Sequence, residues 1–268
     1  MALIDTHCHL DFEAFDADRQ EVLQRAAAAG VEAILNPSID LANSAKVMQL
    51  AESNETVFAA IGVHPNSSQT WQETSTAELR NLAKHSKVVA VGEIGLDYYR
   101  DKAPRAMQQQ VFQRQLDLAA ELELPVIVHN RQAGEDVLRM LLAWQAELAR
   151  NGSPLAAHPG VLHSFSENAA FAQKVLAQNF FIGFTGPVTF RNAPELQQTA
   201  AALPLDHLLV ETDSPFLAPH PHRGQRNEPA MVKLVAGKLA ELRELSIDEV
   251  TTATTASARR LFRFGVGQ

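Results

Sequence analysis

The sequence has a single cysteine, Cys8, among its 268 residues. One cysteine excludes an internal disulfide and is typical of a reducing compartment, so we expect a cytoplasmic protein. Long apolar runs are also missing, and none approaches the roughly 20 residues that a membrane-spanning helix needs. The acidic N-terminal segment does not have the pattern of a secretory signal peptide. These absences predict a protein that does not associate with a membrane.

An excess of positive charge is lacking too, because the formal net charge is -8. Such a charge opposes long-range attraction to nucleic acid or to an anionic membrane. A nucleic-acid substrate would therefore need a local basic site or bound metal ions. What the chain does have is 46% hydrophobic residues, enough for a large core, without a low-complexity stretch or a clear linker. We therefore expect one domain that spans residues 1–268.

Short strand-like runs alternate with longer helical patterns along the whole chain. The expected strands are residues 2–9, 31–36, 57–64, 88–94, 125–129, 160–163, 180–184 and 207–211. Eight such alternations predict an α/β fold, a single (β/α)₈ TIM barrel, with an extra C-terminal helix over residues 247–262. The alternative is an open doubly wound sheet, which normally has a glycine-rich phosphate turn after its first strand. Here that position has His7-Cys8-His9 instead.

Polar residues follow the expected strands, where such barrels concentrate their chemistry. His7 and His9 point to the same side of the first strand, together with Asp5, because side chains alternate along a strand. Later strand ends contribute His64, Glu93, Asp97, His129, His163, Glu211 and Asp213. Ionisable groups that converge in a buried place need partners, and divalent metal ions supply them. The pattern therefore predicts a metal centre.

Two ions about 3.5–4 Å apart, bridged by a carboxylate and a hydroxide, are a recurrent way to activate water. We expect Glu93 to be the bridging carboxylate. The remaining ligands are expected to divide into His7, His9 and Asp213 around one ion and His129 and His163 around the second. Imidazoles suit Zn²⁺, while the carboxylates and phosphate chemistry also admit Mn²⁺ or Mg²⁺, so the metal identity stays open.

Eight motifs in order resemble one known family. They are IDTHCH at 4–9, GVHP at 62–65, VGEIGLDY at 91–98, VHNR at 128–131, VLHSF at 161–165, GFTGPVTF at 183–190, ETDSP at 211–215 and RGQRNEP at 223–229. Together they resemble the TatD family of metal-dependent hydrolases, within the amidohydrolase superfamily. The resemblance implies a (β/α)₈ barrel with one or two metals, and a DNase that often acts as a 3′-to-5′ exonuclease. Its substrate would be nucleic acid, specifically a DNA strand end.

The corresponding mechanistic hypothesis is attack by a metal-bound hydroxide on a phosphodiester phosphorus. Asp213 would orient or deprotonate that water, or serve only as a ligand. His64 is expected to contact the phosphate or transfer a proton, with a structural hydrogen bond as the alternative. Arg131, Arg223 and Arg226 suit bidentate phosphate contacts, with salt bridges between rim loops as the alternative.

Two other functions remain open at this point. The same pair of ions could attack a carbonyl carbon, which would make the protein an ester or amide hydrolase, for example an aminoacyl-tRNA deacylase. A non-catalytic barrel that serves as a scaffold is the other alternative, although every expected ligand position has a competent residue. No obligate protein partner is evident from the sequence.

Overall fold

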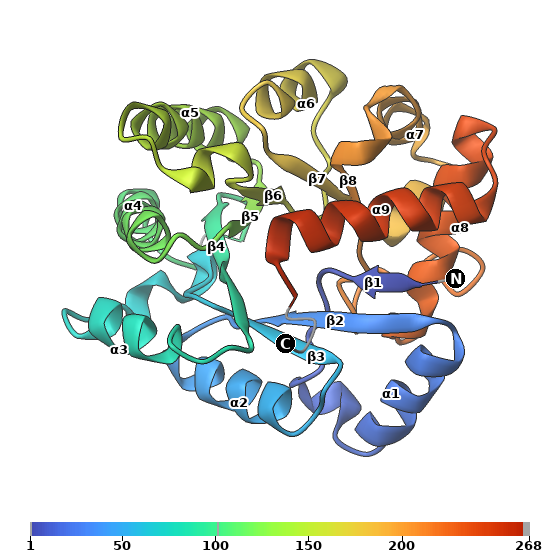
Figure 1. Cartoon of the computed structure of the whole chain (residues 1–268), viewed down its shortest axis with the longest axis horizontal. Coiled ribbons are helices and arrows are strands. Elements are labelled where there is room, and N and C mark those ends of the chain that lie inside the picture. The colour runs from blue at the N-terminus through green and yellow to red at the C-terminus, as the bar shows by residue number, and fades with distance from the viewer. Residues whose placement is uncertain (1, 101, 265–268) are drawn as a thin grey trace. The chain divides into compact units, whose positions relative to one another are not determined.

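The computed structural model describes residues 2–100 and 102–264. Its strands are β1 (Leu3–Asp5), β2 (Val31–Pro37), β3 (Val57–Ile61), β4 (Val88–Asp97), β5 (Val126–Arg131), β6 (Gly160–Leu162), β7 (Phe181–Phe184) and β8 (Leu208–Val210). They belong to one eight-stranded sheet in the order β1 to β8 (Figure 1). Sequence order and spatial order are therefore the same.

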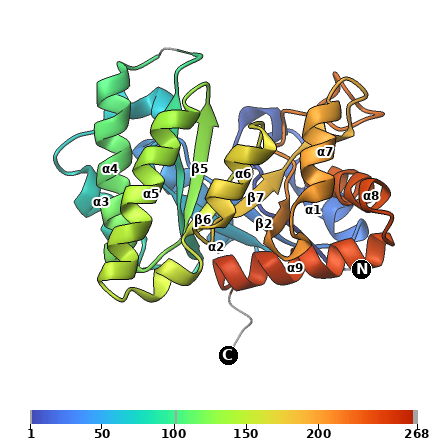
Figure 2. The ribbon, with the colours of Figure 1, turned by 90° about the horizontal axis from the view of Figure 1, so that it is seen from above.

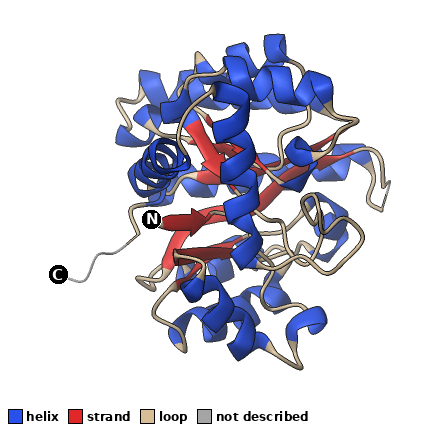
Figure 3. Cartoon of the chain, turned by 90° about the vertical axis from the view of Figure 1, so that its right-hand side faces the viewer, coloured by secondary structure: helices blue, strands red, loops and turns tan. Residues whose placement is uncertain are grey.

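Helices separate the strands (Figure 3). They are α1 (Arg19–Ala28), α2 (Leu41–Glu52), α3 (Ser75–Leu82), α4 (Arg105–Leu122), α5 (Gly134–Arg150), α6 (Ala169–Leu176), α7 (Pro194–Ala202), α8 (Val232–Arg243) and α9 (Ile247–Phe262). α9 follows α8 without an intervening strand and is the expected extra C-terminal helix. None of the described helices combines the length and the apolar content needed to cross a bilayer.

The last strand returns to the first. The backbone N–H of Thr6 donates to Val210 O at 3.3 Å, and Cys8 forms an isolated parallel bridge with Ser214. A sheet whose eighth strand lies beside its first has the connectivity of a barrel. The predicted fold class, a (β/α)₈ barrel, is confirmed.

Local sequence explains why these elements form. β3 has five consecutive buried residues, which is typical of strands in a parallel sheet that is covered on both faces. α5 instead buries one stripe, in which Val137, Leu141, Trp144 and Leu148 recur at helical spacing. A short continuous buried run in the strand and a buried stripe at helical spacing in the helix therefore distinguish these two elements.

The backbone groups into two compact units. The first contains residues 2–36, 164–176 and 181–260, and the second contains residues 37–163, 177–180 and 261–264, except residue 101. Within the first unit α9 lies beside the start of β1 (Figure 1), where Thr255 Oγ1 donates to Ala2 O at 2.8 Å. Within the second, α4 and α5 are neighbours (Figure 2). The single domain over 1–268 stays a prediction.

Some expected boundaries were wrong. β1 ends at Asp5 rather than at His9, although His9 N still donates to Ser214 O at 2.8 Å and keeps the chain close to β8. β4 continues beyond its expected end to Asp97. Both differences lie at the carboxyl ends of strands, where pairing with neighbouring strands, and not the apolar pattern, determines how far a strand continues.

Candidate metal centre

The first candidate site, the His7 cluster, consists of His7, His9 and Asp213. The Nε2 atoms of the two histidines are 3.3 Å apart. Asp213 Oδ1 lies 3.8 Å from His7 Nε2 and 3.6 Å from His9 Nε2. Nitrogen atoms bound to one tetrahedral Zn²⁺ at 2.0–2.1 Å would be about 3.3 Å apart. Two imidazoles and a carboxylate at this spacing fit one divalent ion.

The backbone places Asp213 in this cluster. Its φ of 54° is in the left-handed region, which Asp tolerates better than most residues. Its N–H donates to His7 O at 2.8 Å. Asn227, which is buried, donates through Nδ2 to Thr212 O at 2.8 Å and to Phe216 O at 2.7 Å, on either side of Asp213. The sequence reasoning assigned no role to Asn227, although it lies in the RGQRNEP motif.

Asp5 was expected to face the same way as His7 and His9, and the structure corrects this. Its carboxylate accepts hydrogen bonds from Thr212 N at 2.9 Å and Thr212 Oγ1 at 2.6 Å. Complete burial raises the pKa of Asp5 to about 8. Asp5 therefore holds the residue that precedes Asp213 and is not part of the donor set.

The second candidate site, the Glu93 cluster, consists of Glu93, His64, His129 and His163. Glu93 Oε1 lies 2.7 Å from His129 Nδ1, 3.1 Å from His163 Nε2 and 3.6 Å from His64 Nε2. The pairing of β4 with β5 shifts register between Val91 and Ile94, and such irregularities re-aim side chains next to functional sites. A buried carboxylate that faces three imidazoles needs compensating positive charge, from protons or from a metal ion.

Asp97 supports His129 from the other side of the imidazole ring. Asp97 Oδ2 lies 3.3 Å from His129 Nε2, and Oδ1 accepts from Tyr99 N and Arg100 N at 3.0 and 2.8 Å. Burial lowers the pKa of His129, but hydrogen bonds to Asp97 and Glu93 outweigh it and raise that pKa. Burial likewise opposes ionisation of Asp97, yet His129 and the backbone donors lower the pKa of its carboxyl. A histidine backed by a carboxylate is typical of metal ligation.

His64 faces Glu93 with its Nε2 atom, as His163 does, whereas His129 faces it with Nδ1. Its Nδ1 accepts a hydrogen bond from Asn66 N at 3.1 Å. The neutral ring therefore has its proton on Nε2, the atom that faces Glu93. His64 offers a donor there, which suits the predicted proton transfer or phosphate contact better than metal ligation. That role stays a prediction.

Glu211 and Asp213 were both expected at the end of the last strand, and the two residues lie beyond it in different backbone conformations. β8 ends at Val210, and Asp213 adopts its left-handed conformation beyond it. Glu211, fully buried, accepts from Ser164 N at 2.9 Å and Thr6 Oγ1 at 3.3 Å. Glu211 therefore has hydrogen-bond donors of its own in the first unit, although both carboxylates also lie within 4.8 Å of a ring nitrogen of His7.

The three candidate phosphate-binding arginines differ in their surroundings. Arg131, Arg223 and Arg226 are all exposed, and each guanidinium lies over an aromatic ring, 4.3, 4.5 and 4.9 Å from its centre. Arg226 differs in that it also donates to both carboxylate oxygens of Asp18 at 2.7 Å and to a backbone carbonyl. Arg226 thus makes the salt bridge named above as the alternative to a phosphate contact.

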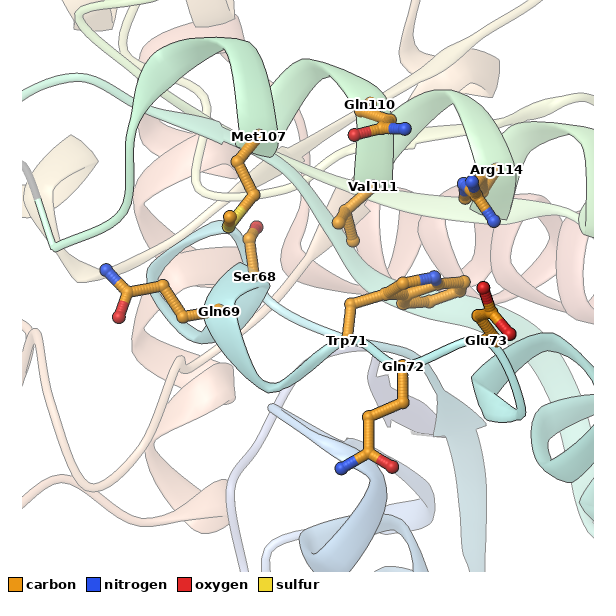
Figure 4. Close-up of a pocket in the computed structure, with 9 residues that line it drawn as sticks. All are labelled: Ser68, Gln69, Trp71, Gln72, Glu73, Met107, Gln110, Val111 and Arg114. Carbon is orange, nitrogen blue, oxygen red and sulfur yellow. The ribbon is translucent and has the colours of Figure 1, made fainter.

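A hollow of about 180 Å³ lies in the second unit, between α4 and the short helix η2 (Pro65–Thr70) (Figure 4). Trp71, Met107 and Arg114 are among its lining residues, and no member of the Glu93 cluster is. Among the described residues Ser68 Oγ and Trp71 Nε1 have no hydrogen-bond partner, but both atoms are covered. The hollow therefore presents no histidine, cysteine or accessible hydroxyl that would carry chemistry.

Comparison with known proteins assigns the family. The family model described as "TatD related DNase" matches residues 4–263. An uncharacterized metal-dependent hydrolase of Bacillus subtilis, YabD, is 44% identical over 261 residues, which cover 97% of this chain and 99% of that protein. The uncharacterized metal-dependent hydrolase YcfH of Escherichia coli is 41% identical over 265 residues, 98% of this chain and 96% of YcfH.

A solved structure agrees with this assignment. The crystal structure of YjjV, a TatD homolog from Escherichia coli K12, matches with a TM-score of 0.89 and 35% sequence identity, and covers 97% of this chain and 98% of YjjV. The family model, the two relatives and the solved structure thus indicate the same family. The chain belongs to the TatD family of metal-dependent hydrolases.

Proposed function

We propose that this protein is a phosphodiesterase that depends on divalent metal ions and removes nucleotides from the 3′ end of a DNA strand. The observation that carries the proposal is the presence of two imidazole and carboxylate clusters in a TatD chain. His7, His9 and Asp213 would hold one ion, and Glu93 with His129 and His163 would hold another. Such ions, when bound, lower the pKa of water and offset charge on the phosphate oxygens. The bridging role of Glu93 stays a prediction.

Asp213 is the group we assign to proton removal from the attacking water. Its side chain is 16% exposed, whereas those of His7 and His9 are 0% and 5% exposed. The carboxylate of Asp213 is therefore more accessible to solvent than the imidazoles of His7 and His9. A general base must lie within hydrogen-bond reach of the water that it deprotonates.

The other polar groups would bind the phosphate and the leaving group. His64 directs its Nε2 proton into the Glu93 cluster, where it can donate to a phosphate oxygen or to the departing alkoxide. Arg131 and Arg223 are exposed guanidinium groups that can reach a phosphate. These few cations suit a strand end better than an extended duplex, given the net charge of -8.

The test is hydrolysis of labelled single-stranded DNA, aminoacyl-tRNA and small carboxylic esters, each with Zn²⁺, Mn²⁺ or Mg²⁺ added to metal-free protein. We expect stepwise shortening of DNA from the 3′ end, only with added metal. Glu93→Ala should abolish it, while Glu73→Ala, which removes an exposed carboxylate in the same unit, should not. The metal content of both variants should be measured beside that of the wild type.

Three outcomes would contradict the proposal. Activity that survives exhaustive chelation would exclude a metal-dependent reaction. Cleavage of aminoacyl-tRNA or esters without cleavage of DNA would show that the protein is an ester or amide hydrolase. Less than one bound ion per chain, with no metal-dependent activity, would favour the scaffold.

A further inference from the structure

An exposed aromatic residue stands beside the His7 cluster. Phe216 follows Asp213 in the same loop, and 52% of its surface is accessible to solvent. Leaving an apolar ring of this size in water forgoes the stabilisation that burial would give. Single exposed apolar side chains are common on protein surfaces. The position of Phe216 next to the His7 cluster, and not its exposure alone, is what suggests that a bound substrate covers the ring.

Phe216 is one end of an aromatic shelf, formed by Phe12 and Phe216. The ring of Phe12 stacks on the imidazole of His9, with centres 4.6 Å apart and planes 20° apart. Phe216 meets Phe12 edge to face, at 6.0 Å and 77°. Both geometries are favourable for aromatic pairs. The shelf thus runs directly from a proposed metal ligand to solvent.

The loop that presents Phe216 is anchored. Phe216 N donates to Asp213 O at 2.9 Å, and Asn227 Nδ2 donates to Phe216 O at 2.7 Å. The backbone of the next residue, Leu217, packs closely on Gly186. A Cβ added to Gly186 would lie 1.8 Å from Leu217 O. The backbone of Phe216 is therefore tied to Asp213, and a ligand that stacks on the ring binds a surface already in place.

We infer that the aromatic shelf binds the nucleobase of the terminal nucleotide while its phosphodiester lies at the His7 cluster. The inference rests on the proposed function and extends it by naming the part of the substrate that determines affinity. Every base offers a flat π face, so stacking tolerates any sequence but requires a base. The shelf selects nucleotides over phosphodiesters that lack a planar group. Phe216 and Phe12 are specificity-determining residues and take no part in bond cleavage.

The test compares two oligonucleotides of the same sequence, one with a natural 3′-terminal nucleotide and one with an abasic tetrahydrofuran residue there. The wild type should cleave the natural end with a KM about 10-fold lower than the abasic end. Phe216→Ala and Phe216→Leu should abolish this preference, because the KM for the natural end rises to that for the abasic end. Phe216→Trp should retain it. Leu142→Ala, which removes an exposed apolar side chain of α5, is the matched control.

Equal KM values for the two ends in the wild type would overturn the inference. The inference would also be overturned if Phe216→Ala or Phe216→Leu kept the preference for the natural end while kcat fell equally for both ends. That result would mean that the ring only maintains the geometry of the His7 cluster. Cleavage without base preference rejects the shelf and leaves the proposed function intact. No cleavage of either oligonucleotide with any divalent ion rejects the proposed function and the inference together.

Discussion

Asp213 combines three properties that no other member of the His7 cluster has: a carboxylate, partial exposure and a left-handed backbone. Residues in sparsely populated conformations persist when their surroundings hold them, and they concentrate at functional sites. Here the surroundings are Asp5, Thr212 and Asn227, which are all buried. The conformation is therefore imposed by hydrogen bonds that involve Asp5 at the end of β1 and Asn227 in the loop before α8.

Asp213→Asn should lower kcat by about 10²–10⁴-fold, because the amide keeps the shape but cannot accept the proton from water. The measurement is turnover of 3′ DNA ends at saturating metal, with the thermal midpoint recorded by circular dichroism. Asp248→Asn, an exposed change at the start of α9, is the control. Full activity in Asp213→Asn would refute the assignment of this residue.

Asp97 should affect metal affinity more than turnover. Asp97→Asn removes the charge that orients His129, and loss of such a partner typically weakens metal binding about 10–100-fold. Titrating metal-free protein with Mn²⁺ or Zn²⁺ should show this shift, with kcat largely recovered at saturating metal. Asp136→Asn, at a carboxylate near the surface, should bind metal normally. An unchanged metal affinity in Asp97→Asn would contradict a supporting role.

Neighbouring strands meet closely where they deliver the ligands. Gly95 in β4 has a φ of 136°, and a Cβ there would lie 2.1 Å from His129 O in β5. Glu93 and His129 are thus held on two strands whose approach requires glycine. Any side chain at this position must separate the strands or distort them.

Gly95→Ala should lower the free energy of unfolding by more than about 2 kcal/mol and reduce activity. The positive φ of Gly95 is unfavourable for alanine, and the added methyl group would collide with the backbone of His129. Gly237→Ala, in the interior of α8, should instead raise the free energy of unfolding by about 0.5–1 kcal/mol. The added Cβ there meets only Ile247 at 3.8 Å, an ordinary contact. Denaturant unfolding measures both. Equal stability of the two variants would show that the tight approach of β4 and β5 is not required.

For the whole molecule the net charge of -8 limits how DNA can bind. If only one or two phosphates are neutralised at a strand end, KM for single-stranded DNA should rise about 7-fold or less between 50 and 200 mM salt. Kinetics at fixed free metal concentration check this. A change on the order of 10³-fold would indicate an extended basic binding surface, contrary to the strand-end proposal.

Local pattern was sufficient for most of the fold. Residues 247–262 form α9 as predicted, and the alternation of strand-like runs with helical patterns predicts the barrel correctly. The His-x-His spacing also predicts correctly that His7 and His9 lie together. These features depend on residues that are close together in the sequence, so the spacing of residue types along the chain is enough to predict them.

Other features depended on residues far apart in the chain. Asp5 bonds to Thr212 instead of facing the donor set, and Arg226 pairs with Asp18. Phe216 became a candidate only when the structure placed it beside Phe12. The sequence by itself determined the strand and helix order and the residues competent to bind metal, because both follow from local periodicity and side-chain chemistry. Only the tertiary structure decided that Asp5 bonds to Thr212, that Arg226 pairs with Asp18 and that Phe216 lies beside Phe12, because contacts between residues far apart in the chain depend on which segments the folded sheet brings together.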